Sequence, residues 1–343
     1  MTEVCRVRVT EVITETPDAC SFVLAVPPEY ADRFRYAPGQ FITVRVPSER
    51  CESVARCYSL SSSPHTDAAP QITVKRTAGG YASNWLCDNV SAGTELTVLP
   101  PAGVFTPRSL GDDLLLLAGG SGITPVASIV KSALSSGSGR LVLVYANQDE
   151  RSVILAGELR ELSARYGTRL TVIHWLESLL GLPDAEQLRA LLTPYAGYQT
   201  YLCGPAGFMD TARAALRELG VDRDRIHVEK FRSLSENPFL AAPAVTEPQE
   251  DRSPASVDVD LDGQQYALTW PAGTKLLDLM LDEGVPAPYS CREGACSACA
   301  CRLVSGEVKM LNNEVLDQED LDDGIILACQ SLPVTDSVRI SYE

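Results

Sequence analysis

Four cysteines near the C-terminal end have the spacing of a metal-cluster ligand set. Cys291, Cys296 and Cys299 follow one another as C-x4-C-x2-C, and Cys329 stands in ILACQS farther on. This is the plant-type spacing of a [2Fe-2S] cluster. A structural zinc site is the weaker alternative, because zinc ribbons carry two short C-x2–4-C pairs and only one such pair is present. The small residues between the cysteines let backbone N–H groups approach the sulfur atoms, which tunes the potential of a cluster.

A second group of reactive residue types lies in the first hundred residues. In RCYSLSS we expect Arg56, Tyr58 and Ser59 to face one way on a strand, with Cys57 facing the other. An aromatic ring can lie on a flavin, a hydroxyl can bond its reactive nitrogen, and a guanidinium can pair with a diphosphate. Taken alone, this pattern also fits an ordinary strand with an exposed arginine. In TVKRTAGGYAS, the residues from Gly80 open a helix whose amides could hold a phosphate pair.

Two further segments fit a nicotinamide nucleotide. The stretch AGGSGITP follows a buried strand and opens a helix, although Pro125 replaces the third glycine of G-x-G-x-x-G. YLCGP stands at another strand end, where Cys203 by itself is more often a small buried hydrophobic residue. After the strand LVLVYA come Asn147, Asp149 and Arg151. Carboxylates suit free ribose hydroxyls and repel a 2′-phosphate, whereas Arg151 argues the other way, so we expect NADH rather than NADPH.

The elements that must position these residues change in type along the chain. Short β-branched runs separated by Pro, Gly and Asp predict six strands and a barrel, at 4–14, 21–26, 39–46, 55–61, 71–76 and 95–99, with a helix at 82–89. Strands then alternate with helices, which predicts a parallel sheet. A stretch rich in Pro, Ala and acidic residues reads as a linker. We therefore expect a flavin barrel at 1–108, a nucleotide domain at 109–232, a linker at 233–255 and a cluster domain at 256–343.

Composition and charge exclude several classes of protein. The formal net charge is −16, which argues against binding nucleic acid. Residues 257–343 hold 16 acidic and 5 basic side chains, so most of that charge lies in the last domain; this acidity either steers a partner or serves solubility alone. We see no signal peptide and no apolar run of the roughly 20 residues that a membrane span needs. Eleven cysteines without a disulfide pattern fit a reducing compartment, so we expect a cytoplasmic protein. We also expect a monomer.

The last ~85 residues, with PYSCREGACSACACRLVSGEV and ILACQS, resemble a plant-type ferredoxin domain. That resemblance implies a β-grasp fold of the α+β class and a [2Fe-2S] cluster on Cys291, Cys296, Cys299 and Cys329. Residues ~1–232, with R-x-Y-S, G-x-x-S, G-x-G-I-T-P and C-G-P in this order, resemble the ferredoxin–NADP reductase superfamily. The segment GGYASN offers no cation that would bind the terminal phosphate of FMN, which favours FAD over FMN.

The superfamily resemblance implies the residues of two cofactor sites. The flavin site would comprise Arg56, Cys57, Tyr58, Ser59, Thr73, Val74, Lys75, Gly80, Tyr81, Ala82, Ser83 and Phe231, the last a candidate for the ring that covers the flavin. The nicotinamide site would comprise Gly120, Ser121, Gly122, Thr124, Pro125, Asn147, Asp149, Arg151, Cys203, Gly204, Pro205 and Met209. Ser59, Thr124 and Cys203 would be the catalytic residues, positioning flavin and nicotinamide along the hydride path.

The order of the three domains resembles reductase components of multicomponent oxygenases. The whole chain, including SVARCYSLSSSP and HWLESLLGLP, closely resembles the reductases of 3-ketosteroid 9α-hydroxylases. The phenylacetyl-CoA epoxidase reductase is among the near relatives of that family. This implies electron flow from NADH through FAD and the cluster to a Rieske-type oxygenase in steroid breakdown. Two alternatives remain: a reductase for another oxygenase, and a non-catalytic redox or zinc-binding module.

Overall fold

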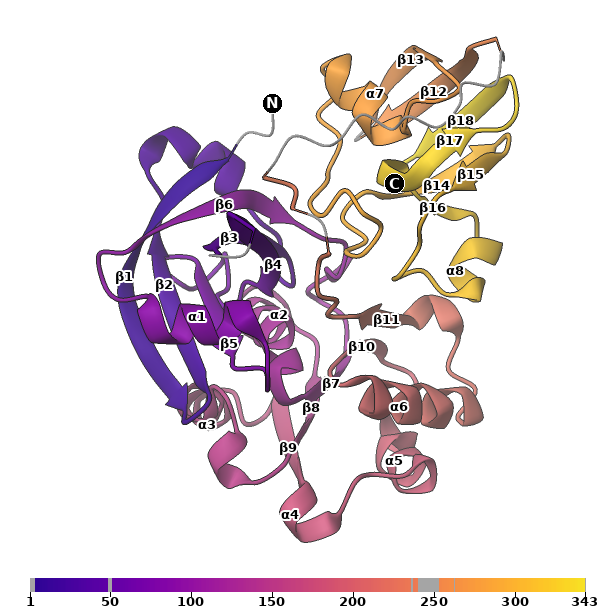
Figure 1. Ribbon diagram of the computed structural model, residues 1–343. Helices are drawn as coiled ribbons and strands as arrows, with labels where there is room; N and C mark the ends of the chain where they lie inside the picture. Colours follow the sequence, from indigo (N-terminus) through magenta and orange to yellow (C-terminus); the bar gives the residue numbers. More distant parts are fainter. Residues whose placement is uncertain (1–3, 49–50, 236, 240–252, 262, 343) are drawn as a thin grey trace.

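The computed structural model describes the chain except residues 1–3, 49–50, 236, 240–252, 262 and 343. Three domains follow one another and pack together (Figure 1). Most of the predicted linker lies outside the described residues. Within the described ranges no helix is both long and apolar enough to cross a bilayer.

The first domain is an antiparallel barrel. Its strands pair in the order β4-β3-β6-β1-β2-β5, and a bridge between Leu60 and Ile72 joins the two outer strands. Helix α1 covers one end and adds Leu86 to a core of Val, Leu, Ile and Phe side chains. The elements are β1 (Cys5–Thr16), β2 (Ala19–Ala25), β3 (Phe41–Pro47), β4 (Ser53–Ser59), β5 (Gln71–Lys75), α1 (Tyr81–Asn89) and β6 (Glu95–Ala102).

The second domain is a parallel sheet with helices on both faces. Strand β7 alternates its side chains: Leu114 and Leu116 pack toward α2 and α3, while Leu115 and Leu117 pack toward α5 and α6. The sheet order is β11-β10-β7-β8-β9. Successive strands are added on one side of β7 and then on the other, so the order of strands reverses between β7 and β10, and such sheets bind ligands at this point. The elements are β7 (Leu114–Gly119), α2 (Ile123–Ser136), β8 (Leu141–Asn147), α3 (Ala156–Arg165), β9 (Leu170–Leu176), α4 (Glu177–Leu180), α5 (Ala185–Leu192), β10 (Gln199–Cys203), α6 (Ala206–Glu218) and β11 (Ile226–Glu229).

The third domain is a mixed sheet crossed by a helix, built around Trp270, which is fully buried. Strands pair in the order β13-β12-β18-β14-β16, with a separate β15-β17 pair. The elements are β12 (Ala255–Leu261), β13 (Gln264–Trp270), α7 (Leu276–Asp282), β14 (Ala300–Ser305), β15 (Val308–Met310), α8 (Gln318–Asp322), β16 (Ile325–Leu327), β17 (Ser331–Pro333) and β18 (Ser337–Ser341).

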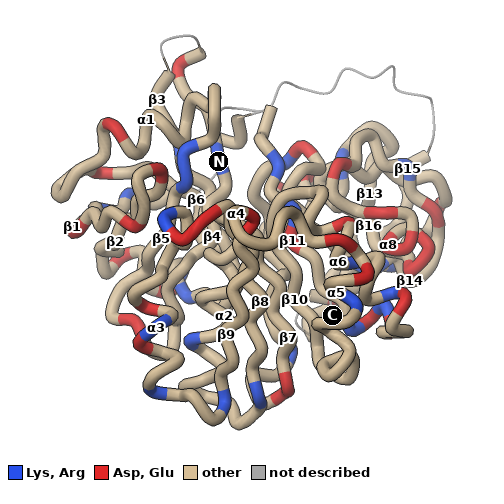
Figure 2. The backbone as a smooth tube through the Cα atoms, turned by 90° about the horizontal axis from the view of Figure 1, so that it is seen from below, with Lys and Arg blue, Asp and Glu red and all other residues tan. Residues whose placement is uncertain are grey.

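The third domain contacts both of the others. Its cysteine loop packs on the barrel in a small apolar cluster that includes Phe41, Ala55 and Cys296. On the second domain, basic residues of α6 and the segment after it meet the acidic helix α8, where blue and red positions adjoin in Figure 2. The cysteine loop is thereby brought against the strand that carries R-x-Y-S.

Candidate electron-transfer site

Strand β4 presents two different faces. Tyr58 pairs with Ile42 of β3 and packs against the barrel core, whereas Arg56, which pairs with Val44, donates from its guanidinium to the Leu234 carbonyl at 2.9 Å. Cys57 pairs with Thr43, and its thiol lies 3.4 Å from the Thr43 hydroxyl on the opposite side.

The prediction that Ser59 shares the face of Arg56 and Tyr58 is wrong. Ser59 is 4% exposed and lines a small cavity together with Cys57. The reason is the two-residue period of a strand, which places Ser59 and Cys57 on one side and Tyr58 on the other.

The glycine turn before α1 is shaped for close approach. Gly80 is the N-cap, and a Cβ there would lie 2.9 Å from the Thr77 side chain. Ser83 is buried, and its hydroxyl accepts a hydrogen bond from the Thr77 amide at 3.0 Å, which fixes the turn. The remaining amides of the first helical turn are thus oriented outward for a phosphate pair.

The other residues predicted for the flavin site lie in different environments. Val74 and Ala82 are buried in the barrel core, and the Thr73 hydroxyl bonds Ser21 and Ser61, so these side chains support the site from behind. Tyr81 is 46% exposed. The Lys75 side chain instead lines the neighbouring nucleotide cavity.

A cavity of about 490 Å³ lies at the carboxyl ends of the parallel strands, beside the turn after β7. Its lining includes Gly120 from that turn, Asn147 from β8, and Pro205 after β10. The turn and β10 pack without space for side chains, since a Cβ on Gly122 would stand 2.1 Å from the Cys203 carbonyl oxygen. Asn147 is 8% exposed, and within the described part of the chain neither atom of its amide has a partner. A buried amide without partners at a cavity wall fits a ligand that supplies them.

Several predicted nucleotide residues do not reach this cavity. The Asp149 carboxylate caps a short 3-10 helix by accepting from the Arg151 and Ser152 amides, so it is already engaged. Met209 packs in the core beneath α6. Thr124 is buried, and its hydroxyl bonds the Ser121 carbonyl, while Pro125 is buried within α2. Neither Arg151 nor any of these lines the cavity.

Sequence reasoning missed a carboxylate that does line the cavity. Glu177 follows β9 directly, at the strand end next to that of Asn147. The usable signal was its position after the third parallel strand, since strand ends gather at one edge of such a sheet. Trp175 and Phe208 add aromatic surface to the same cavity.

The four predicted cluster cysteines are brought together and are each at most 7% exposed. Cys291 Sγ accepts from the Ala295 amide at 3.3 Å, and Cys299 Sγ accepts from the Cys329 amide at 3.5 Å. Hydrogen bonds from the Cys296 and Cys329 thiols lower the pKa of Cys291 to about 3, so it is poised as a thiolate ligand.

The backbone of this loop supports that arrangement. Arg292 and Ser297 have φ of 61° and 53°, in the left-handed region, and the amide that follows Arg292, that of Glu293, lies 3.5 Å from Cys291 Sγ. Gly294 is required, because a Cβ there would lie 2.8 Å from the Asn312 carbonyl oxygen.

The three domains meet at the small cavity that Ser59 and Cys57 line. Phe231, Glu229 and Cys296 also line it, so a residue of the strand that carries R-x-Y-S and a cluster ligand share one cavity.

Glu229 pairs with Cys203 across β11 and β10 and is 8% exposed. Burial raises the pKa of its carboxyl to about 8 and the pKa of the Cys203 thiol well above its usual value. Cys203 is therefore a neutral packing group here, whereas Glu229 can exchange a proton near neutral pH.

Family models match each domain in turn. Residues 6–106 match an oxidoreductase FAD-binding domain, residues 116–214 an oxidoreductase NAD-binding domain, and residues 259–334 a 2Fe-2S iron-sulfur cluster binding domain. The chain is 56% identical, over 97% of its length and 95% of the relative, to a 3-ketosteroid-9-alpha-monooxygenase, ferredoxin reductase component, of Rhodococcus rhodochrous. This chain belongs to that family of ferredoxin reductase components. A protein of the same description from Mycolicibacterium smegmatis is 55% identical over 99% of this chain and 97% of its own length.

Solved structures show the same architecture for this ferredoxin reductase component. Phthalate dioxygenase reductase aligns over 98% of both chains with a TM-score of 0.59 at 24% identity, which supports the fold alone. The full-length CYP116B46 of Tepidiphilus thermophilus aligns over 98% of this chain and 42% of its own, with a TM-score of 0.67 and 26% identity.

The residues of the reductase fit the three cofactors of its domains. The glycine turn of α1 fits FAD, and the unpaired Asn147 amide fits a nucleotide. The four buried thiols with amides directed at their sulfur atoms fit a [2Fe-2S] cluster. The family model that covers these cysteines describes a 2Fe-2S cluster domain, which favours the cluster over the zinc alternative.

Proposed function

We propose that this reductase passes electrons from NADH through FAD and its [2Fe-2S] cluster to a Rieske-type terminal oxygenase, that of a 3-ketosteroid 9α-monooxygenase. The supporting observation is the small cavity at which Ser59 and Cys296 meet, because it joins the flavin strand to the cluster loop. Bound FAD would supply the conversion between two-electron hydride transfer from NADH and one-electron transfer to the cluster.

The chain's own residues position these cofactors. On this proposal Arg56 and Tyr58 would bind the flavin, and Ser59, which shares the small cavity with Cys296, would link the flavin site to the cluster loop. Gly80 and Ser83 shape the phosphate end of the site, and Gly120, Gly122, Gly204 and Pro205 do so for the nicotinamide nucleotide. Burial raises the pKa of the Cys57 thiol to about 12 and the pKa of the Cys203 thiol well above its usual value, so both thiols stay neutral.

We propose NADH as the donor because Glu177 places a carboxylate in the nucleotide cavity. A carboxylate accepts hydrogen bonds from ribose hydroxyls and repels a 2′-phosphate. Glu177→Gln is expected to lower the ratio of kcat/KM for NADH over NADPH about 10-fold, mainly by improving NADPH. Glu186→Gln, an exposed neighbour on α5, should leave the ratio unchanged.

Reconstitution tests the electron path and the acceptor. The purified protein should show flavin and [2Fe-2S] absorbance, both bleached by NADH without oxygen. NADH-dependent turnover should then appear with the oxygenase component of a 3-ketosteroid 9α-monooxygenase. A colourless protein contradicts the electron path; a coloured protein that drives only another oxygenase contradicts the steroid assignment. Because one chain carries all three cofactor domains, we propose a monomer, in the cytoplasm where eleven free cysteines stay reduced.

A further inference from the structure

A short connector lies between the flavin strand and the cysteine loop. It comprises residues 231–235 and 237–239, which leave the second domain after β11 and pass between the first and third domains (Figure 1). Leu234 of the connector is 5% exposed and packs with Phe41 of the barrel and Cys296 of the loop. Phe239 packs against the same cluster. The connector therefore fills part of the interface between β4 and the cluster ligands.

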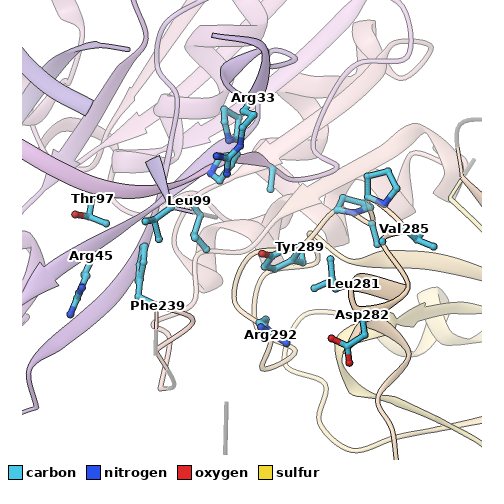
Figure 3. Close-up of a pocket in the computed structure, with 18 of the residues that line it drawn as sticks. Arg33, Arg45, Thr97, Leu99, Phe239, Leu281, Asp282, Val285, Tyr289 and Arg292 are labelled. Atoms are coloured by element: carbon cyan, nitrogen blue, oxygen red, sulfur yellow. The ribbon is translucent and has the colours of Figure 1, made fainter. Parts of the chain in front are cut away.

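Beside the connector, a cleft of about 1050 Å³ separates the barrel from the ferredoxin domain (Figure 3). Phe239 lies on the barrel side of this cleft, and Tyr289 and Arg292 lie on the opposite side. The hydroxyls of Thr43 and Ser290 are hydrogen-bonded across the interface between the two domains. Because the cleft reduces the direct contact between these domains, the position of the cysteine loop depends strongly on what the connector binds.

The connector is hydrogen-bonded to β4 at two points. Asn237 Nδ2 donates to the carbonyl oxygen and to the hydroxyl of Ser53, both at 2.8 Å. Asn237 Oδ1 accepts from the Phe239 amide at 3.1 Å, which orients the side chain for these bonds. Farther along β4, Arg56 Nη1 donates to the Leu234 carbonyl at 2.9 Å. These bonds fix the connector to the strand that carries R-x-Y-S.

On its other side the connector binds a buried carboxylate of the cysteine loop. Glu293 stands between the ligands Cys291 and Cys296 and is 5% exposed. Its carboxylate accepts from the Ser235 amide at 3.0 Å and from the Ser235 hydroxyl at 2.8 Å. Hydrogen bonds to a buried charged group are strong, because the charge has lost its hydration and needs other partners. Ser235 therefore holds the loop at a point between two cluster ligands.

We propose that Ser235 and Glu293 are positioning residues for electron transfer, because their hydrogen bonds keep the cysteine loop at a fixed separation from β4. The step concerned is the passage of the first electron from the reduced flavin to the oxidised cluster. It oxidises the flavin by one electron, reduces the cluster by one and leaves the flavin proton in place. Its rate falls steeply with the separation of the two cofactors, so a small displacement of the loop slows it. This inference rests on the proposed function and adds which residues set the spacing.

The experiment follows the holoprotein by stopped flow, without oxygen, after mixing with NADH. The flavin band reports hydride transfer, and the cluster bands report the electron that follows. The variant is Ser235→Ala, which removes the hydroxyl bond to Glu293 and keeps the amide bond. Ser235→Thr restores a hydroxyl. Ser233→Ala is the matched control, because Ser233 is an exposed serine of the same connector.

Ser235→Ala should slow cluster reduction about 3- to 10-fold, since a bond to a charged group is lost where small displacements matter. Hydride transfer to FAD in this variant, and cluster reduction in Ser235→Thr and Ser233→Ala, should change by less than about twofold. In a Glu293→Gln background, Ser235→Ala should have a smaller effect, because the hydroxyl acts through that carboxylate. The midpoint potential and the EPR spectrum of the cluster should be the same in the wild type and in Ser235→Ala.

An unchanged rate of cluster reduction in Ser235→Ala overturns the proposal, and so does an equal slowing in Ser233→Ala. A slower rate together with a shifted midpoint potential also overturns it, since Ser235 would then act on the potential of the cluster and not on its position. If NADH reduces the flavin of the wild type but never the cluster, the proposed electron path fails. If the wild type reduces both and all variants match it, the positioning role alone fails.

Discussion

Removing one charged pair between the second and third domains should measurably lower the thermal stability of the ferredoxin domain. Arg213 Nη2 on α6 lies 2.7 Å from Asp317 Oδ2, and the two side chains are 17% and 24% exposed. Arg223 reinforces the contact, with Nε 2.9 Å from Glu319. Burial raises the pKa of Asp317, but the Asp320 amide and the Arg213 charge outweigh it, so the pKa lies below its usual value. The pair is therefore charged throughout the physiological range.

The expected coupling follows from this geometry. Exposed ion pairs contribute about 0.2–1 kcal/mol, and hydrogen bonds to charged groups about 1.5–3 kcal/mol. A pair at hydrogen-bond distance and about one-fifth exposed should fall between, at about 1–2 kcal/mol. Docking stabilises the folded ferredoxin domain by linkage, and for a domain of this size 1 kcal/mol shifts Tm by roughly 4–8 °C.

A double-mutant cycle of Arg213→Gln and Asp317→Asn isolates the pair. Asparagine keeps the cap that Asp317 provides to the Asp320 amide, so only the charge is removed. Loss of the cluster absorbance on heating at a fixed scan rate gives Tm, and we expect a coupling of at least about 4 °C that shrinks in 0.5 M salt. The control cycle, Arg189→Gln with Glu218→Gln, addresses a more exposed pair at 3.6 Å. Equal coupling in both cycles would refute the reasoning.

Three further changes test other parts of the site. Cys296→Ser should abolish NADH-dependent cytochrome c reduction while ferricyanide reduction at the flavin persists; loss of neither would take the cluster off the electron path. Glu229→Gln should raise Tm relative to wild type by an amount that grows between pH 5 and pH 8. Burial raises the pKa of this carboxyl from 4.5 to about 8, so keeping it protonated in the folded protein destabilises the wild type increasingly over that window. A difference in Tm that does not change with pH contradicts this. Gly122→Ala should lower stability by roughly 1–3 kcal/mol and weaken NADH binding, because its Cβ meets the Cys203 carbonyl oxygen, whereas Gly157→Ala has open space and serves as control in urea unfolding.

The sequence predicted those parts of the molecule that local spacing encodes. The cluster cysteines follow from C-x4-C-x2-C, because the loop that presents three of the ligands is continuous in the chain. The barrel strands and the parallel sheet follow from their alternating and continuous apolar runs. The barrel, the parallel sheet and the presence of a 2Fe-2S domain are confirmed by the three family-model matches and the shared architecture.

Contacts between distant segments could not be predicted in this way. The burial of Glu229 depends on which strand lies beside β11, and the local sequence does not encode the order of the strands. The position of Glu177 after β9 indicates only the edge of the sheet at which it lies. The acidity of the last domain was read as an outward face, but part of it, at Asp317 and Glu319, is bound by arginines of the nucleotide domain. The orientation of Ser59 was within reach of the sequence, since the period of a strand alone places it beside Cys57.

The two faces of β4 have a consequence for how this chain can change. This strand carries Arg56 and Tyr58, which we propose bind the flavin, on one side and Ala55 and Cys57, which pack with the cluster loop, on the other. Deleting one residue from it would exchange the two sets, placing Cys57 in the barrel and Tyr58 against the iron–sulfur loop. Side chains along β4 can therefore vary, but its length cannot, and insertions in this family should fall in the loops on either side of residues 53–59.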